Sequence, residues 1–195
     1  MPQATPPVFI QSETIFDAAG EPIQVGCEQE SSSFSTYSNG TVRYRRRTSS
    51  GWLEETIDVG MGIYCNARVV LDTAGEPMAI WYDTANNDLR FARRNGGTWA
   101  PKELVSTNAA YAVSMVLGPA GQPWVSHSTP TTVELAARAA DGTWSTETVF
   151  TSTAQTTSLR LVAGEPWLLA NVNPITVARK TAGAWTTTVL STTSG

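Results

Sequence analysis

The sequence predicts an all-β protein, a β-propeller with four four-stranded antiparallel blades. A glycine-containing turn recurs four times in the 195 residues, as DAAGEP, DTAGEP, GPAGQP and VAGEP. A tryptophan that follows a second glycine-rich turn recurs in phase with it. No segment has the apolar spacing of an amphipathic helix. A period of about 45 residues is typical of propeller blades.

Three kinds of residue keep the same phase in all four repeats. The first-turn glycines are Gly20, Gly75, Gly121 and Gly164. The tryptophans are Trp52, Trp99, Trp144 and Trp185, and six residues before each stands an arginine, namely Arg46, Arg93, Arg138 and Arg179. We interpret these arginines as structural, because they recur once per blade rather than gathering at one site.

The second repeat illustrates the four expected strands, which are rich in the β-branched and aromatic residues that favour strands. They cover residues 67–72, 77–82, 89–94 and 99–105. Gly75 supplies the positive φ of the first turn, and Pro77 opens the second strand, where a missing N–H is tolerated. The second strand is apolar on both sides, which indicates sheets packed face to face.

One meander of this length cannot cover both of its apolar faces, and radial stacking of four meanders solves the problem. We therefore expect a single propeller domain over residues 1–195, with blades at about 8–59, 63–106, 111–151 and 156–192. No strand is left over to complete a shared closing blade. Two assemblies remain, a closed four-blade monomer and a head-to-tail homodimer that forms an eight-bladed ring. We favour the monomer, which avoids the entropy cost of association.

The composition argues against several classes of partner. The net charge is −4 and the pI is about 5.0, with basic residues mostly dispersed, so we expect no nucleic-acid partner. No run is long and apolar enough for a membrane span, and no membrane partner is expected. No cofactor is predicted. Cys27 and Cys65 either form one bridge or remain small buried apolar groups, and the compartment stays open.

The pattern DxxGxPxxxxY, followed by LxxAR and GxxW, resembles the repeats of sialidase-like (BNR-type) β-propellers over nearly the whole chain. This resemblance implies the propeller architecture. The sequence departs from the family at the Asp-box, Ser-x-Asp-x-Gly-x-Thr-Trp, which occupies the turn between the third and fourth strands. Only fragments such as ADGTW at 140–144 remain, so the Asp-boxes are not intact.

The connections fall on two rims of the predicted propeller. The glycine turns between strands one and two, and three and four, lie on one rim and are uniform. The second rim carries loops that differ between repeats, at 28–40, 83–88, 128–132 and 171–174, and the links between blades, at 58–66, 106–111 and 151–157. Variable loops on a uniform scaffold usually carry binding residues, so we assign function to this variable rim.

Aromatic and polar residues at strand ends point to a ligand on the variable rim. The candidate ligand-binding residues are Tyr64, Arg68, Trp81, Tyr82, Asp83, Tyr111 and His127. A sugar ring packs its C–H groups on an aromatic face while its hydroxyls need polar partners. The alternative is that these residues pack between blades.

No catalytic or metal-binding residues are assigned. A sialidase-like site needs three convergent arginines, and the predicted topology does not bring three together. His127 is the only histidine, which excludes a metal site built from several histidines. The DTANND segment at 83–88 has oxygen ligands suited to calcium, but such turns also form without metal, and no metal is predicted.

The sequence therefore favours a ligand-binding or scaffold propeller, whose partner is a glycan or another small molecule met at the variable rim. The alternative is an enzyme, a sialidase-like glycoside hydrolase. A purely structural, self-assembling propeller unit is the third hypothesis. The localisation is not predicted.

Overall fold

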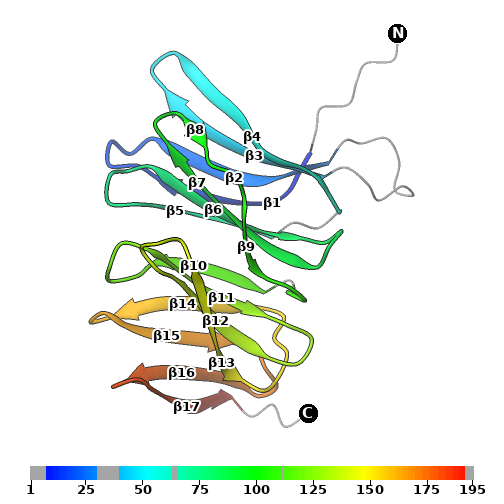
Figure 1. Cartoon of the computed structure of the whole chain (residues 1–195), viewed down its shortest axis with the longest axis vertical. Coiled ribbons are helices and arrows are strands. Elements are labelled where there is room, and N and C mark those ends of the chain that lie inside the picture. The colour runs from blue at the N-terminus through cyan, green and yellow to red at the C-terminus, as the bar shows by residue number, and fades with distance from the viewer. Residues whose placement is uncertain (1–7, 30–39, 63–65, 111, 192–195) are drawn as a thin grey trace. The chain divides into compact units, whose positions relative to one another are not determined.

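A computed structural model describes residues 8–29, 40–62, 66–110 and 112–191. The chain forms two compact units, Met1–Leu104 and Val105–Gly195. The described residues form four antiparallel sheets and no helix, so none of their segments is a helix able to cross a membrane (Figure 1). The predicted all-β class with four four-stranded blades is confirmed.

The first unit holds blades 1 and 2. Blade 1 runs in the order β1 (Val8–Phe16), β2 (Pro22–Gln29), β3 (Gly40–Thr48) and β4 (Gly51–Met61). Blade 2 runs in the order β5 (Ala67–Leu71), β6 (Pro77–Asp83), β7 (Asp88–Asn95) and β8 (Thr98–Trp99), with β9 (Glu103–Ser106) also paired to β7. Consecutive strands pair with each other, as expected for a meander.

The fourth strand of blade 2 differs from the single strand that the sequence predicts over 99–105. It is divided into β8 and β9 by residues 100–102. Pro101 lies in this gap and has no N–H to donate to the sheet ladder, which is the physical reason for the interruption. Both pieces still pair with β7, so the blade keeps four strand positions.

The second unit holds blades 3 and 4. Blade 3 runs in the order β10 (Val113–Leu117), β11 (Pro123–Ser128), β12 (Val133–Arg138) and β13 (Trp144–Phe150). Blade 4 runs in the order β14 (Thr157–Val162), β15 (Glu165–Ala170), β16 (Ile175–Thr181) and β17 (Ala184–Ser191).

The first turn of a blade has the backbone that the repeated glycine predicts. Gly75 has φ +80°, a conformation that other L-residues rarely adopt, and the equivalent glycines have φ between +71° and +81°. The Asp72 carboxylate closes this turn, because its Oδ1 accepts hydrogen bonds from the N–H groups of Ala74 (2.8 Å) and Glu76 (2.9 Å). Asp17 closes the blade 1 turn in the same way.

The core of the first unit lies between blades 1 and 2. Its buried side chains come from the inner strands of both sheets, among them Ile23, Val25, Tyr44, Val69 and Trp81. Cys27 belongs to this cluster and is disulfide-bonded. Cys65, the other cysteine of the chain, lies outside the described residues. The bridged alternative for Cys27 is therefore the one observed.

The core of the second unit lies between blades 3 and 4. Leu135, Leu159, Leu168 and Ala170 are among its buried members. Two polar contacts also join the blades: Ser126 donates its Oγ–H to Thr157 (3.0 Å), and the Leu159 N–H donates to Ser114 Oγ (3.1 Å). In the second unit, apolar packing is thus reinforced by hydrogen bonds between strands of the two blades.

Candidate functional site

The β6–β7 turn brings together two of the predicted site residues. Tyr82 is buried and donates its hydroxyl to Asn87 Oδ1 (2.8 Å). The buried Asp83 carboxylate accepts the Ala85 N–H (3.1 Å) and the Asn86 side-chain amide (2.8 Å). Asn86 and Asn87 are themselves exposed. The turn thus presents two amides whose positions are fixed from beneath by an aromatic hydroxyl and a carboxylate.

Arginines near the variable rim form ion pairs with carboxylates of their own blade. Asp88 Oδ2 lies 2.5 Å from Arg90 Nη2. In blade 1, Glu28 binds Arg43 Nε (2.8 Å) through one oxygen and Arg45 Nη2 (2.6 Å) through the other. These ion pairs compensate the arginine charges locally, so the arginines do not form a shared anion site among the described residues.

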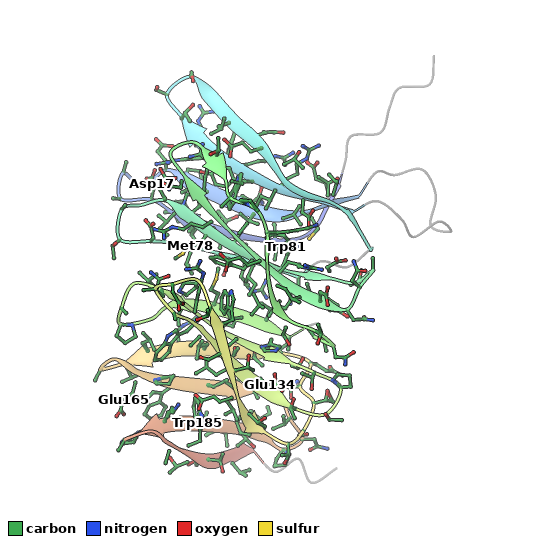
Figure 2. All side chains as sticks on the ribbon, in the orientation of Figure 1. Asp17, Met78, Trp81, Glu134, Glu165 and Trp185 are labelled. Atoms are coloured by element: carbon green, nitrogen blue, oxygen red, sulfur yellow. The ribbon has the colours of Figure 1, made fainter. Side chains whose placement is uncertain are left out.

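The other predicted site residues are distributed over both units. Trp81 is fully buried in the first-unit core (Figure 2), and Arg68 donates to the carbonyl of Ala67 (2.8 Å). His127 is also fully buried, with Nε2 3.3 Å from Glu134 Oε2. Burial lowers the pKa of His127, although the Glu134 carboxylate opposes that shift. Tyr64 and Tyr111 lie outside the described residues.

The repeated arginines bind the first turn of their own blade, on the uniform rim. Arg46 Nη2 lies 2.9 Å from Asp17 Oδ2, and Arg93 Nη2 lies 2.5 Å from Asp72 Oδ2. The backbone N–H of Glu21 and the Arg46 guanidinium lower the pKa of Asp17. Blades 3 and 4 lack this aspartate, and their arginines bind other turn residues, Arg138 to Gln122 and Arg179 to Glu165.

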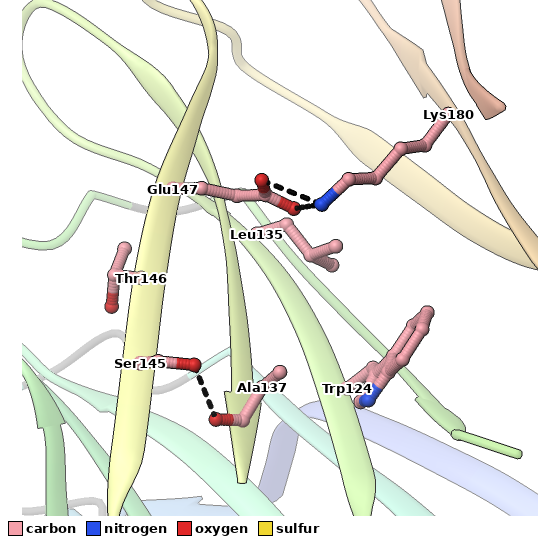
Figure 3. A pocket seen from close by; sticks show the side chains of 7 residues that line it. All are labelled: Trp124, Leu135, Ala137, Ser145, Thr146, Glu147 and Lys180. Carbon is pink, nitrogen blue, oxygen red and sulfur yellow. Dashed lines mark hydrogen bonds and ion pairs between the residues drawn. The ribbon is translucent and has the colours of Figure 1, made fainter. Parts of the chain in front are cut away.

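A pocket of about 260 Å³ opens between blades 3 and 4, inside the second unit (Figure 3). It is lined from β11, β12, β13 and β16 by Trp124, Leu135, Ala137, Ser145, Thr146, Glu147 and Lys180. Figure 3 shows an ion pair at one side of this pocket and the Trp124 ring at another. We call it the blade 3/4 pocket.

Three side chains that line the blade 3/4 pocket are smaller than their counterparts in blade 1. Strand pairing places Leu135, Ala137 and Ser145 of blade 3 in the rows that Tyr44, Arg46 and Leu53 occupy in blade 1. In the first unit the large Tyr44 is buried and meets Trp99 edge to face, with ring centroids 5.4 Å apart. The corresponding volume of the second unit is left open.

Trp124 is held in place by a glycine. Gly118 opens the first turn of blade 3, where blades 1 and 2 have Asp17 and Asp72. A Cβ at Gly118 would lie only 2.6 Å from the indole Nε1 and 2.8 Å from Cδ1 of Trp124. Only glycine therefore lets the ring rest against this turn, and the loss of the aspartate and the presence of the tryptophan are coupled.

The charged side of the pocket is a close ion pair. Lys180 Nζ lies 2.6 Å and 2.7 Å from the two carboxylate oxygens of Glu147. The Glu147 side chain is 38% exposed and that of Lys180 26% exposed, so both remain in contact with solvent. Lys180 also lies over the Trp185 ring, 5.8 Å from its centroid. The pair can donate to and accept from one ligand hydroxyl.

Sequence reasoning missed this pocket, although part of its signal was present. Glu55 and Glu147 each stand three residues after a repeated tryptophan, and Arg94 and Lys180 each follow a repeated arginine. These residues pair across blades, Glu55 with Arg94 and Glu147 with Lys180. A charge kept in phase in alternate repeats could have indicated an inter-blade ion pair.

The described residues contain no group of three or more His, Cys, Asp or Glu side chains arranged to hold a metal ion. The two carboxylates of the 83–88 segment are engaged by the chain itself. Asp83 binds the turn, and Asp88 binds Arg90. This segment is thus held by Asx-type hydrogen bonds and an ion pair.

The chain is similar in fold to solved β-propeller proteins. No protein-family model matches it, and neither does any curated protein. It aligns with virginiamycin B lyase from Staphylococcus aureus (13% identity, TM-score 0.56, 98% of this chain and 72% of that one). It also aligns with an α-L-arabinanase from Penicillium chrysogenum (13%, 0.61, 91% and 64%) and an exo-β-1,3-galactanase from Phanerochaete chrysosporium (12%, 0.52, 84% and 42%).

The chain spans less than two thirds of the arabinanase and less than half of the galactanase. TM-scores of 0.52 to 0.61 indicate a shared fold, and identities of 12% to 13% leave the activity open. The two glycan-active matches and the lyase are β-propeller proteins. The chain accordingly has the β-propeller fold.

Proposed function

We propose that the protein is a carbohydrate-binding β-propeller whose ligand meets the variable rim. The β6–β7 turn is the observation that carries this proposal. Asn86 and Asn87 are exposed there, and Tyr82 and Asp83 beneath them fix their side chains. Amides held in place lose little conformational freedom when they bind hydroxyl groups, which favours recognition of a sugar.

Two of the structural neighbours give independent support for a carbohydrate ligand. The arabinanase was solved with arabinobiose, and a β-1,3-galactanase was solved with galactose. Their similarity to this chain covers the propeller fold only. It makes a neutral glycan the first ligand class to test at the rim.

The sialidase-like alternative has one specific observation in its favour. The blade 3 turn at 139–143 is closed by Asp141, whose Oδ1 accepts from the N–H (2.9 Å) and Oγ (2.7 Å) of Thr143. This is the Asp-box fragment of the sequence. Against hydrolysis, Arg43 and Arg90 are already paired with carboxylates, so a sialic acid carboxylate would have to displace them.

A glycan array that includes arabinan and galactan fragments tests the proposal, together with a fluorogenic sialoside assay. We expect binding without turnover. The rim variant is the double substitution Asn86→Ala and Asn87→Gly. Glycine is used at position 87 because Asn87 has φ +57°. This variant should lose array binding while keeping the wild-type circular dichroism spectrum.

Asn95→Ala is the matched control, because Asn95 is an exposed asparagine at the opposite end of β7. It should bind as the wild type does. Sialoside turnover would instead establish the hydrolase. The absence of both binding and turnover would leave the structural, self-assembling unit.

A further inference from the structure

We propose that the blade 3/4 pocket is a subsite for a single neutral sugar ring, with Trp124 as its stacking wall and the Glu147–Lys180 pair as its hydroxyl-binding side. This inference rests on the proposed carbohydrate-binding function and adds a second location, at the blade 3/4 interface rather than at the variable rim. Four observations carry it: the size of the pocket, the fixed ring, the charge balance and the comparison with blade 1.

The size of the pocket limits the ligand. Its volume of about 260 Å³ lies just below the roughly 300 Å³ at which pockets for drug-sized ligands begin. One pyranose or furanose ring fits such a space, and a longer oligosaccharide would have to extend out of it. The pocket therefore suits a terminal or side-branch residue.

The aromatic wall is held before any ligand arrives. Trp124 rests on Gly118, where a Cβ would lie 2.6 Å from the indole nitrogen. The side chain at the same position after the strand-opening proline is Ile23 in blade 1 and Met78 in blade 2. Those blades keep an aspartate, which carries a Cβ, at the position of Gly118. A ring that is positioned in advance costs little entropy on binding.

The charge balance of the pocket selects against ionic ligands. Glu147 and Lys180 compensate each other at 2.6 Å, and the other lining groups are the uncharged Ser145, Thr146, Trp124, Leu135 and Ala137. A carboxylate would meet Glu147, and a cation would meet Lys180. A hydroxyl can donate to the glutamate while it accepts from the ammonium group. The preferred ligand is consequently a neutral polyol ring.

The test uses the full chain, uniformly labelled with ¹⁵N so that tryptophan indole and asparagine amide signals are both observed, and four soluble probes at millimolar concentration. The neutral probes are methyl β-D-galactopyranoside and L-arabinose, and the anionic probes are glucuronic acid and N-acetylneuraminic acid. The Trp124 resonance is assigned as the indole signal that is absent in Trp124→Met. We expect at least one neutral probe to shift this resonance and the anionic probes to leave it unchanged.

Two variants measure the role of each side of the pocket. Trp124→Met introduces the residue found in blade 2, and we expect roughly tenfold weaker binding of the neutral probe from the loss of ring stacking. Lys180→Met should also weaken binding while leaving Trp124 in place. Trp167→Met is the matched control, since Trp167 follows the equivalent proline of blade 4 and does not line the pocket. Thermal melts verify that all three variants are folded.

The outcomes separate this inference from the proposed function. If the probes shift only the Asn86 and Asn87 amides and Trp124→Met binds normally, the pocket assignment is wrong and the rim function stands. Stronger binding of the anionic probes at Trp124 would overturn the charge argument. If no probe shifts any residue and the glycan array is blank, both the pocket and the proposed function are wrong.

Discussion

The blade 1/2 and blade 3/4 interfaces use the same positions and reach different results. Each joins a glutamate of one blade to a cation of the next, Glu55 to Arg94 and Glu147 to Lys180. In the first unit the space beside the pair is filled by Tyr44, whereas in the second it is a pocket. A repeated scaffold thus acquires a pocket through the sizes of a few side chains.

The two ion pairs also differ in the number of side chains that contact them. Arg94 binds both oxygens of Glu55, at 2.8 and 2.9 Å, and lies over the Tyr44 ring, while Trp99 donates its indole N–H to the same carboxylate (2.9 Å). The Trp185 indole N–H, by contrast, is buried and has no hydrogen-bond partner among the described residues. A lysine lacks the planar guanidinium, so it cannot bind a carboxylate through two separate nitrogens as Arg94 does.

The largest expected effect is the loss of the first-unit tryptophan. Trp99→Ala should lower the free energy of unfolding by about 3 to 5 kcal/mol, because it removes a packed ring and the indole bond to Glu55. Trp52 is 52% exposed, so Trp52→Ala should cost less than about 1 kcal/mol. Urea denaturation of both variants measures the difference. Equal losses would mean that the repeated tryptophans are interchangeable.

Exchanging the side chains that distinguish the two interfaces should have opposite consequences. Tyr44→Leu gives blade 1 the residue of blade 3 and should destabilise the protein by about 2 to 4 kcal/mol, because a buried ring is lost. Leu135→Tyr should cost less than about 2 kcal/mol, since the new ring can extend into the pocket. Chemical denaturation of each variant tests this. A larger cost for Leu135→Tyr would show that the pocket cannot accept a ring.

The aspartate that closes the first turn in blades 1 and 2 should contribute a smaller amount. Asp72→Ala removes two hydrogen bonds to backbone N–H groups and the partner of Arg93, and should cost about 1 to 2 kcal/mol. Thr73→Ala, in the same turn, is the control and should be near neutral. Thermal melting provides the measurement. No difference between the two variants would mean that Gly75 alone defines the turn.

The smallest effect concerns acid. The Arg94 guanidinium, aided by the Trp99 indole and opposed by burial, lowers the pKa of Glu55 below its usual 4.5. The unfolded state then binds more protons between the two pKa values, so this stabilisation is complete above about pH 4.5 and is lost as the pH falls through the folded value. Glu55→Gln should flatten the decline of stability below pH 5.

Glu147→Gln is the matched control for the acid experiment. It changes the equivalent carboxylate of the second unit and leaves the Glu55–Arg94 pair intact. Melting temperatures between about pH 3 and pH 7 should retain the Glu55 contribution in this variant. An equal flattening in both variants would show that the two interfaces respond to acid alike.

The sequence alone determined the blade plan of this protein. The four-strand pattern and the glycine turns are local features: Gly75 needs its positive φ whatever surrounds it, and Pro77 can open a strand without a donor. The interruption at Pro101 could also have been predicted, since proline has no N–H to donate to a neighbouring strand. The prediction of one strand over residues 99–105 did not take this proline into account.

The candidate rim residues could be predicted only in part from the sequence. The variable loops identified Tyr82 and Asp83, but the hydrogen bonds that fix Asn86 and Asn87 depend on the turn conformation. The assignment of these residues to ligand binding remains a prediction.

The blade 3/4 pocket was decided by tertiary structure. In sequence Arg46 aligns with Arg138, but the β12–β13 turn has five residues, 139–143, where the β3–β4 turn has two. Strand pairing also puts Ala137, rather than Arg138, opposite Trp124 of β11 and opposite Ser145 of β13. The volume of the pocket then depends on what blade 4 places opposite. Periodicity fixes residues along a strand, whereas a cavity is set by the packing of one sheet against another, which no single repeat contains.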